Sequence, residues 1–292
     1  MNKIIDAHIH FSNIQAFYGA AEISGVDYSY EGYVKEREAA GIVAGVCMGL
    51  EEATPFGFPD KAAQVPMSLG LPREGAPSGG ENGLHVPSSV FTCLGINPHT
   101  LDADAVARIR QRVQTDPTVV GFKIYAGYYH YYVHDPIYAP VYAIAAEFGL
   151  TVAIHTGVTY SEHGIMDYSH PLTADRMAVQ YRDTQFLLCH MGNPWIMDAC
   201  EVAYKNRNVF LDISGLVEGD AALLDYTESE PLLMVHYKTG LVYLNDYKKV
   251  LFGTDWPIVP MARYAEFCKK ITPERAWNDV FYENARRVYR LP

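Results

Sequence analysis

The stretch "IIDAHIH" at residues 4–10 places an apolar pair ahead of two histidines, His8 and His10, that are separated by a single residue. On a β-strand, side chains two residues apart point to the same face of the sheet. If this stretch is a strand, both imidazole rings therefore point toward one place. Whether it is a strand depends on the pattern of the rest of the chain.

Short apolar runs of the same kind, rich in β-branched residues, recur along the whole chain. The eight runs cover residues 4–9, 42–48, 90–96, 119–125, 151–155, 185–190, 209–213 and 250–253. Helix-like stretches lie between most of them, among them 104–114, 140–148, 195–204 and 232–244. Apolar strands that alternate with helices are typical of a parallel sheet covered by helices. Eight such units predict an α/β fold, and a (β/α)₈ TIM barrel in preference to an open sheet.

No shift in composition marks a domain boundary, so we expect residues 1–292 to form one TIM-barrel domain. The least regular segment, residues 51–88, is rich in glycine and proline. It is expected to form a long excursion after the second strand, with a cap over the barrel mouth as one role for it. Residues 273–292 are expected to add an extra helix that closes the chain.

The charge and cysteine content limits the partners of this protein. The net charge is −11, and no cluster of lysine and arginine is present. This argues against nucleic acid and membrane partners and leaves a small-molecule substrate, with self-association into a homo-oligomer as a further option. The five cysteines form no C-x-x-C pair, there is no room for a signal peptide, and no apolar run could span a bilayer. We therefore expect a soluble, cytoplasmic protein.

Ligand-type side chains stand at the carboxyl ends of several predicted strands. They are His8 and His10 after the first, His155 after the fifth, His190 after the sixth and Asp255 after the eighth. In a TIM barrel these strand ends meet at the mouth, where active sites lie. Imidazole and carboxylate groups are suitable ligands for zinc and similar divalent metals. A single strand-end histidine can be structural, but five such residues together predict a metal site.

Several motifs resemble the amidohydrolase superfamily, and within it the branch that includes aminocarboxymuconate-semialdehyde decarboxylase and the resorcylate decarboxylases. They are "DAHIH" at 6–10, "GFKIYAGY" at 121–128, "AIHTG" at 153–157, "CHMG" at 189–192, "LFGTDWP" at 251–257 and "ENARRVYRL" at 283–291. The resemblance implies that His8, His10, His155 and Asp255 bind one divalent metal, usually zinc. It also implies that His190 is a general base or a ligand of a second metal, and that Asp255 both binds metal and takes a proton from water.

Lys123 and Tyr125 are predicted to bind the substrate. Alternation along the fourth run places them on the same face, and a lysine inside a barrel needs a paired charge or must lose its proton. We expect an unmodified Lys123 that offers its ammonium group to a substrate carboxylate. The alternatives are a lysine that reaches outward to solvent, or a carboxylated lysine bridging two metals as in dihydroorotase and phosphotriesterase. Many relatives carry histidine where this chain has Tyr125.

Several other residues are weaker candidates for functional roles. The aromatic segment at 125–136 either shapes a pocket for a planar substrate or packs as a loop or subunit interface. His99 is either a mouth residue or a turn residue, and Asp212 either orients substrate or caps a loop. Arg37 and Arg73 are candidate partners for a carboxylate. Asp6 is expected to be structural.

The main functional hypothesis is a metal-dependent hydrolase that acts on a small, carboxylate-bearing organic substrate through a metal-activated water. His190 and Asp255 would be its catalytic residues. The alternative is a metal-dependent, non-oxidative decarboxylase of an unsaturated or aromatic acid. A non-catalytic barrel with a structural metal is disfavoured, because structural zinc sites are normally closed and rich in cysteine.

Overall fold

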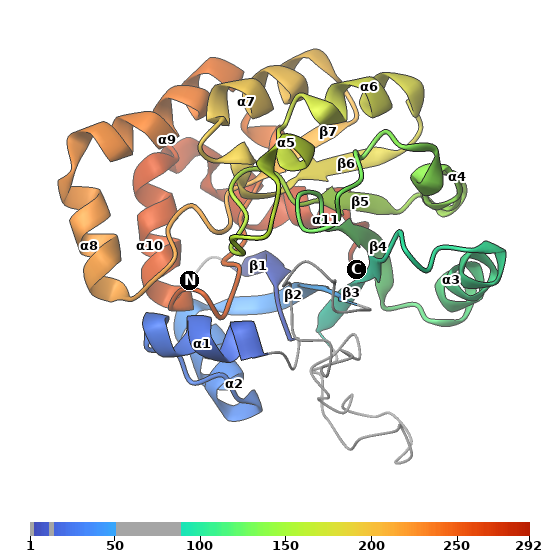
Figure 1. Cartoon of the computed structure of the whole chain (residues 1–292). Coiled ribbons are helices and arrows are strands. Elements are labelled where there is room, and N and C mark those ends of the chain that lie inside the picture. Colours follow the sequence, from blue (N-terminus) through green and yellow to red (C-terminus); the bar gives the residue numbers. More distant parts are fainter. Residues whose placement is uncertain (1–2, 12–14, 51–88) are drawn as a thin grey trace.

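The computed structural model describes residues 3–11, 15–50 and 89–292 of the chain. Within these residues, parallel strands form one eight-stranded sheet in sequence order (Figure 1). The strands are β1 (Ile4–Ile9), β2 (Ile42–Met48), β3 (Val90–Ile96), β4 (Val119–Ile124), β5 (Thr151–Ile154), β6 (Gln185–Leu188), β7 (Val209–Asp212) and β8 (Val250–Leu251). The predicted segment 51–88 lies outside the described residues.

Backbone hydrogen bonds between the first strand and the chain just after the last one bring the two ends of the sheet together. The His10 amide donates to the Trp256 carbonyl and the Asp255 amide donates to the His8 carbonyl, both at 2.8 Å. Such pairing converts an open sheet into a barrel. The predicted (β/α)₈ TIM barrel is therefore confirmed.

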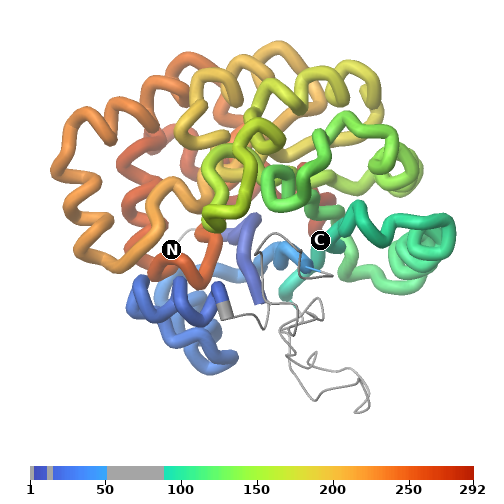
Figure 2. The backbone as a smooth tube through the Cα atoms, in the orientation of Figure 1, coloured from blue at the N-terminus to red at the C-terminus, as the bar shows by residue number. Residues whose placement is uncertain are grey.

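The helices form an outer layer around the strands (Figures 1 and 2). They are α1 (Gln15–Ser24), α2 (Tyr30–Ala40), α3 (Ala103–Thr115), α4 (Ala139–Phe148), α5 (Met166–Ser169), α6 (Thr173–Gln180), α7 (Ile196–Lys205), α8 (Ala221–Ser229), α9 (Pro231–Leu244), α10 (Met261–Ile271) and α11 (Asn284–Val288). The four helices predicted by their residue ranges agree with α3, α4, α7 and α9 to within one residue at each end. None of the helices in the described residues is long and apolar enough to cross a membrane.

Local capping explains where several helices begin. The Asp102 side chain accepts a hydrogen bond from the Ala105 amide at 2.8 Å, and the Asp220 side chain accepts one from the Leu223 amide at 3.0 Å. These bonds satisfy amide groups that have no partner inside the helix. They also set where the loops after β3 and β7 end, and those loops run from the barrel mouth to the outer layer.

The carboxyl-terminal segment covers the other end of the barrel. The predicted extra helix is broken into a 3₁₀ turn (Glu274–Ala276), a π-helical turn (Asp279–Glu283) and α11. The Asn284 side chain donates to the Val250 carbonyl, and Thr151 donates to the Val288 carbonyl, at 2.7 and 2.6 Å. These contacts involve the amino-terminal ends of β8 and β5. The opposite end, where the strands terminate, is left for the site.

Several strands end earlier than the sequence indicated. β5 ends at Ile154 and β6 at Leu188, so His155 and His190 belong to the loops that follow. His190 has a left-handed backbone with φ of 61°, which no strand residue adopts. The chain turns sharply there because it leaves the sheet. The predicted runs were too long because apolar composition continues past the last residue of each strand.

Candidate active site

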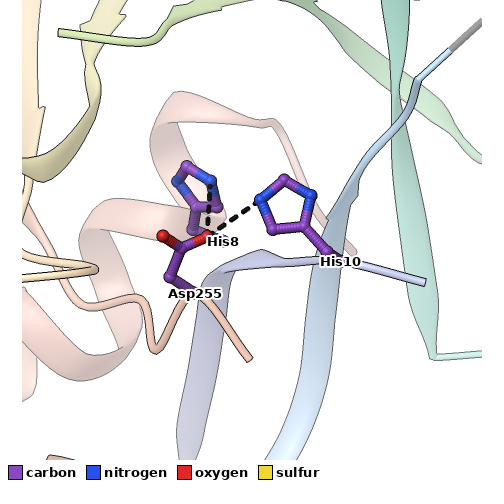
Figure 3. Close-up of side chains that lie close together, drawn as sticks. All are labelled: His8, His10 and Asp255. Carbon is purple, nitrogen blue, oxygen red and sulfur yellow. Dashed lines mark ion pairs between the residues drawn. The ribbon is translucent and has the colours of Figure 1, made fainter. Parts of the chain in front are cut away.

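Three of the predicted metal ligands meet where the first strand joins the segment after the last (Figure 3). Asp255 Oδ1 lies 2.8 Å from His10 Nε2 and 3.3 Å from His8 Nε2. One ligand atom from each residue falls within 4.8 Å of the others, close enough to hold one metal ion. The two imidazoles predicted to share a face thus converge on one carboxylate.

The turn that carries Asp255 is held by a buried hydrogen-bond network. Asp255 has a left-handed backbone with φ of 63°, a conformation uncommon outside glycine and tolerated best by Asp, Asn and His. Asp6 Oδ1 accepts from the Thr254 amide at 2.9 Å, and Asp6 Oδ2 accepts from the Thr254 hydroxyl at 2.6 Å. The Thr254 hydroxyl in turn accepts from the Trp256 amide at 3.0 Å. Asp6 therefore supports the turn, the structural role expected for it.

The protonation states of this cluster suit metal binding. Burial lowers the pKa of both His8 and His10, which favours the neutral imidazoles that metals require. Burial alone would raise the pKa of Asp255, but the neighbouring histidines outweigh it and hold that pKa well below its usual range. His10 Nδ1 and Asp255 Oδ1 are buried without a hydrogen bond of regular geometry. A divalent metal fits this set of two neutral imidazoles and one carboxylate.

The predicted fourth ligand, His155, reaches the same mouth but pairs with His190. His155 Nδ1 lies 3.1 Å from His190 Nε2, while His155 Nε2 lies 3.0 Å from the Val158 carbonyl. Because a carbonyl can only accept, Nε2 of His155 carries the proton and Nδ1 presents a lone pair. Burial lowers the pKa of His155 well below its usual value and that of His190 to about 4. Ligation of the same metal by His155 stays a prediction.

His190 also approaches the free side of Asp255. Its Nδ1 lies 3.7 Å from Asp255 Oδ2, whereas Asp255 Oδ1 faces His8 and His10. A Cβ atom at Gly215 would lie 2.8 Å from both Asp255 Oδ2 and His190 Nδ1. Glycine at this position therefore keeps the space beside the two polar atoms open.

Lys123 faces the barrel interior, so the alternative of a lysine reaching outward is wrong. Only 1% of its surface is exposed, and its Nζ lies 3.4 Å from His8 Nε2 and 3.1 Å from Cys189 Sγ. The same Nζ lies 5.4 Å from the centre of the Tyr125 ring, a cation–π contact. Within the described part of the chain, no carboxylate forms an ion pair with Lys123. Its ammonium group is thus available to a substrate anion.

The aromatic segment at 125–136 divides between the two roles considered for it. Tyr125 lines the cavity and its hydroxyl donates to the Gly49 carbonyl at 2.8 Å. Tyr128 also lines the cavity and packs edge-on against His155. Tyr129 and Tyr131 instead contact His99, which is exposed and is not among the cavity-lining residues described. The first half of the segment shapes the pocket, and the second half packs as a loop.

A cavity that opens to solvent collects the candidate residues. The residues lining it include His10, Lys123, Tyr125, His155, His190 and Asp255, together with Phe17, Tyr128, Tyr160 and Glu218. The Phe17 ring stacks on His10, with ring centres 4.6 Å apart. The cavity is therefore aromatic on its walls and polar at its floor.

The structure adds residues that the sequence did not single out. Glu218 lies in the loop after β7, and although the residue as a whole is exposed, burial of its carboxyl group and the charge of Asp255 raise its pKa to about 7. Ser214, in the same loop, contacts the rings of His8 and His190. Neither belongs to a motif or a periodic pattern, so the only available signal was their position shortly after a predicted strand.

Three weaker candidates remain. Asp212 is buried, and its Oδ1 accepts from the Ser214 amide at 3.1 Å, so it caps the loop after β7, one of the two roles considered for it. Its Oδ2 also lies 3.0 Å from His8 Nδ1, where it orients a histidine. Arg37 donates to the Ile42 and Val43 carbonyls at the amino-terminal end of β2, and it is therefore not a carboxylate partner at the mouth. Arg73 lies outside the described residues.

Similar folds with full coverage occur among solved structures. An uncharacterised TIM-barrel protein from Bordetella bronchiseptica is 20% identical, with 99% of each chain covered and a TM-score of 0.72. The 5-carboxyvanillate decarboxylase of Sphingomonas paucimobilis is 17% identical, with 100% of each chain covered and a TM-score of 0.62. A probable 2-pyrone-4,6-dicarboxylic acid hydrolase of Acinetobacter baumannii is 11% identical, with 99% of each chain covered and a TM-score of 0.61. These likenesses establish the fold.

The family is established by the sequence itself. A search of curated proteins found no significant match. The sequence model of the amidohydrolase family, however, matches residues 80–291, which is most of the chain and includes the segments that carry Lys123, His155, His190 and Asp255. Since the match extends from the third strand to the closing helix, this protein belongs to the amidohydrolase family.

Proposed function

We propose that this protein is a metal-dependent hydrolase that acts on a small organic substrate bearing a carboxylate. The proposal rests on the two carboxylate oxygens of Asp255, which face different partners. Its Oδ1 faces the Nε2 atoms of His8 and His10, while its Oδ2 lies 3.7 Å from His190 Nδ1. One carboxylate can thus hold a metal and accept a proton beside a second titratable group.

His8, His10 and Asp255 would hold the metal, with His155 as the candidate fourth ligand. A bound divalent metal, of which zinc fits the donor set best, supplies Lewis acidity that polarises a substrate carbonyl and lowers the pKa of water. Asp255 Oδ2 accepts the proton of the attacking water. His190, which its burial keeps neutral, takes up this proton from Asp255 and passes a proton on to the leaving group, so that it ends neutral again.

The lining of the cavity supports a substrate that is both anionic and planar. Lys123 provides a buried ammonium group, and an unpaired buried charge gains most from an anion that replaces its lost hydration. Phe17, Tyr125 and Tyr128 provide aromatic walls suited to an unsaturated or cyclic ligand. Four buried cysteines, Cys93, Cys189, Cys200 and Cys268, form no disulfide bond, which supports a reducing, cytoplasmic location.

A decarboxylase is the second candidate, and one contact favours it. Lys123 Nζ lies 3.4 Å from His8 Nε2, so a substrate carboxylate bound to Lys123 would be held against the metal cluster. That arrangement orients a planar acid for loss of CO₂ without any attacking water. The structurally similar proteins include both kinds of enzyme by name, a 5-carboxyvanillate decarboxylase and a probable 2-pyrone-4,6-dicarboxylic acid hydrolase.

Isotope labelling separates the two reactions. The zinc-loaded protein would be incubated with a panel of cyclic esters and hydroxybenzoates bearing carboxylates, in ¹⁸O-labelled water and separately in D₂O. Hydrolysis places ¹⁸O in the product carboxylate. Decarboxylation releases CO₂ and places deuterium on the carbon that carried it. ¹⁸O incorporation without CO₂ supports the hydrolase, and the reverse outcome rejects it.

A further inference from the structure

Asp212, the last residue of β7, connects two histidines of the site. It is fully buried, and its Oδ2 lies 3.0 Å from His8 Nδ1. Its Oδ1 accepts from the His190 amide at 2.9 Å, from the Ser214 amide at 3.1 Å and from the Ser214 hydroxyl at 2.5 Å. Every partner of this carboxylate is therefore a donor, and both oxygens are used.

These contacts determine where the proton of His8 lies. The two atoms close to His8 Nδ1 are Asp212 Oδ2 and, at 3.1 Å, Ser214 Oγ. The Ser214 hydroxyl already gives its proton to Asp212, so its oxygen can only accept. His8 Nδ1 must then carry the ring proton, which leaves the lone pair on Nε2. That nitrogen is the one that faces Asp255 Oδ1 at 3.3 Å.

The same reasoning does not extend to His190. Its Nδ1 is close to three acceptors, Ser214 Oγ at 3.0 Å, the Ser214 carbonyl at 3.2 Å and Asp255 Oδ2 at 3.7 Å. His190 Nε2 faces another acceptor, the lone pair of His155 Nδ1, at 3.1 Å. With acceptors on both sides, the contacts of His190 do not select one tautomer, so the assignment holds for His8 alone.

We infer that Asp212, acting with Ser214, is a positioning residue that fixes the Nδ1–H tautomer of His8. The ring then presents its Nε2 lone pair to the centre of the site. A partner that holds the other nitrogen of a metal-binding histidine commonly fixes its tautomer and its basicity. The role at His8 rests on the proposed function, because that function makes His8 Nε2 a metal ligand.

The substitution Asp212→Asn tests this because the amide can fit in only one orientation. Its oxygen must stay at the Oδ1 position, where the His190 and Ser214 amides both donate. Its NH₂ group then faces His8 Nδ1, which can take that bond only as an acceptor. The ring proton moves to Nε2, and this nitrogen can no longer bind metal. We expect the affinity for Zn²⁺ to fall by about 10- to 100-fold.

Asp175→Asn is the control. Asp175 forms an ion pair with Lys205 in the outer layer and is not among the cavity-lining residues described. The control removes one carboxylate charge without touching an imidazole and should leave the Zn²⁺ affinity unchanged. Equal affinities of the wild type and Asp212→Asn would overturn the inference.

A spectroscopic measurement reads the tautomers directly. In the full-length, metal-free protein labelled with ¹⁵N-histidine, long-range proton–nitrogen correlations should show His8 as Nδ1–H. In Asp212→Asn, the His8 signal should change to Nε2–H. An Nε2–H ring at His8 in the wild type would refute the inference even if the variant did not fold. Failure of the wild type to bind Zn²⁺ would instead count against the proposed function.

Discussion

Asp255 Oδ1 lies 2.8 Å from His10 Nε2, and this contact joins the segment after the last barrel strand to the end of the first. Neither residue could hold a metal alone. They meet because backbone hydrogen bonds at 2.8 Å tie residues 8 and 10 to residues 255 and 256. Closure of the barrel and assembly of the site are therefore one structural event.

Removal of the first-strand histidines should abolish metal binding without unfolding the barrel. In the double variant His8→Ala and His10→Ala, two of the three clustered ligands are lost, while the packed layers that stabilise the barrel remain. Elemental analysis should find no stoichiometric metal, turnover should vanish and circular dichroism should be unchanged. His99→Ala, at an exposed turn, is the control. Normal metal content in the double variant would contradict the assignment.

His190 should be needed for turnover and dispensable for the principal metal. It lies outside the cluster of His8, His10 and Asp255, and its nearest approach to Asp255 is 3.7 Å. We expect His190→Asn to retain about one metal per chain and to lower turnover by at least about 10²-fold, as loss of a general acid–base group does. Metal content and kcat would be measured on the same sample. If the principal metal disappears, His190 is a primary ligand.

Lys123 should be unmodified and should bind the substrate carboxylate. Lys123→Met keeps the length of the buried side chain and removes its charge, so kcat/KM should fall for carboxylate substrates and much less for their neutral amides. Lys205→Met, at a surface ion pair, is the control. Intact-mass measurement under gentle conditions should find a bare amine, and elemental analysis one metal. A carboxylated Lys123 together with two metals per chain would contradict this prediction and would indicate that Lys123 bridges a pair of metals.

The metal-free protein should lose stability as the pH falls from about 6.5 to about 4. Burial lowers the pKa of His190 to about 4. Between pH 6.5 and pH 4, the histidine therefore binds a proton in the unfolded chain and stays neutral in the folded chain. The contribution of His190 to the free energy of unfolding is complete above pH 6.5 and is lost as the pH falls through the pKa of the folded state. One such group accounts for about 3 kcal/mol.

Urea unfolding at pH 7.5 and pH 4.5 would measure this loss. His190→Asn should lose less stability over the same interval, because asparagine does not titrate. The variant His134→Asn, whose ring is only partly buried and lies outside the cavity lining, should behave like the wild type. Equal losses of stability in the wild type and in His190→Asn between the two pH values would rule out a neutral, buried His190.

The sequence by itself determined the barrel and most of the side chains at its mouth. Strand and helix periodicities are local properties, and eight alternating units leave few ways to bury their apolar faces. Since active sites of such barrels lie at the carboxyl ends of the strands, the sequence alone predicted that His8, His10 and Asp255 lie close together. The inward direction of Lys123 followed from alternation on β4, which is regular.

Only the tertiary structure decided how those side chains pair. The backbone at His190 and Asp255 is left-handed, so the directions of their side chains do not follow the alternation of the strands before them. The family resemblance implied that His155 joins His8 and His10, and only the fold shows that its Nδ1 lies against His190 Nε2. The hydrogen bonds of Asp212 join β7 to β1 and β6, and no local pattern encodes contacts between strand ends so far apart in the chain.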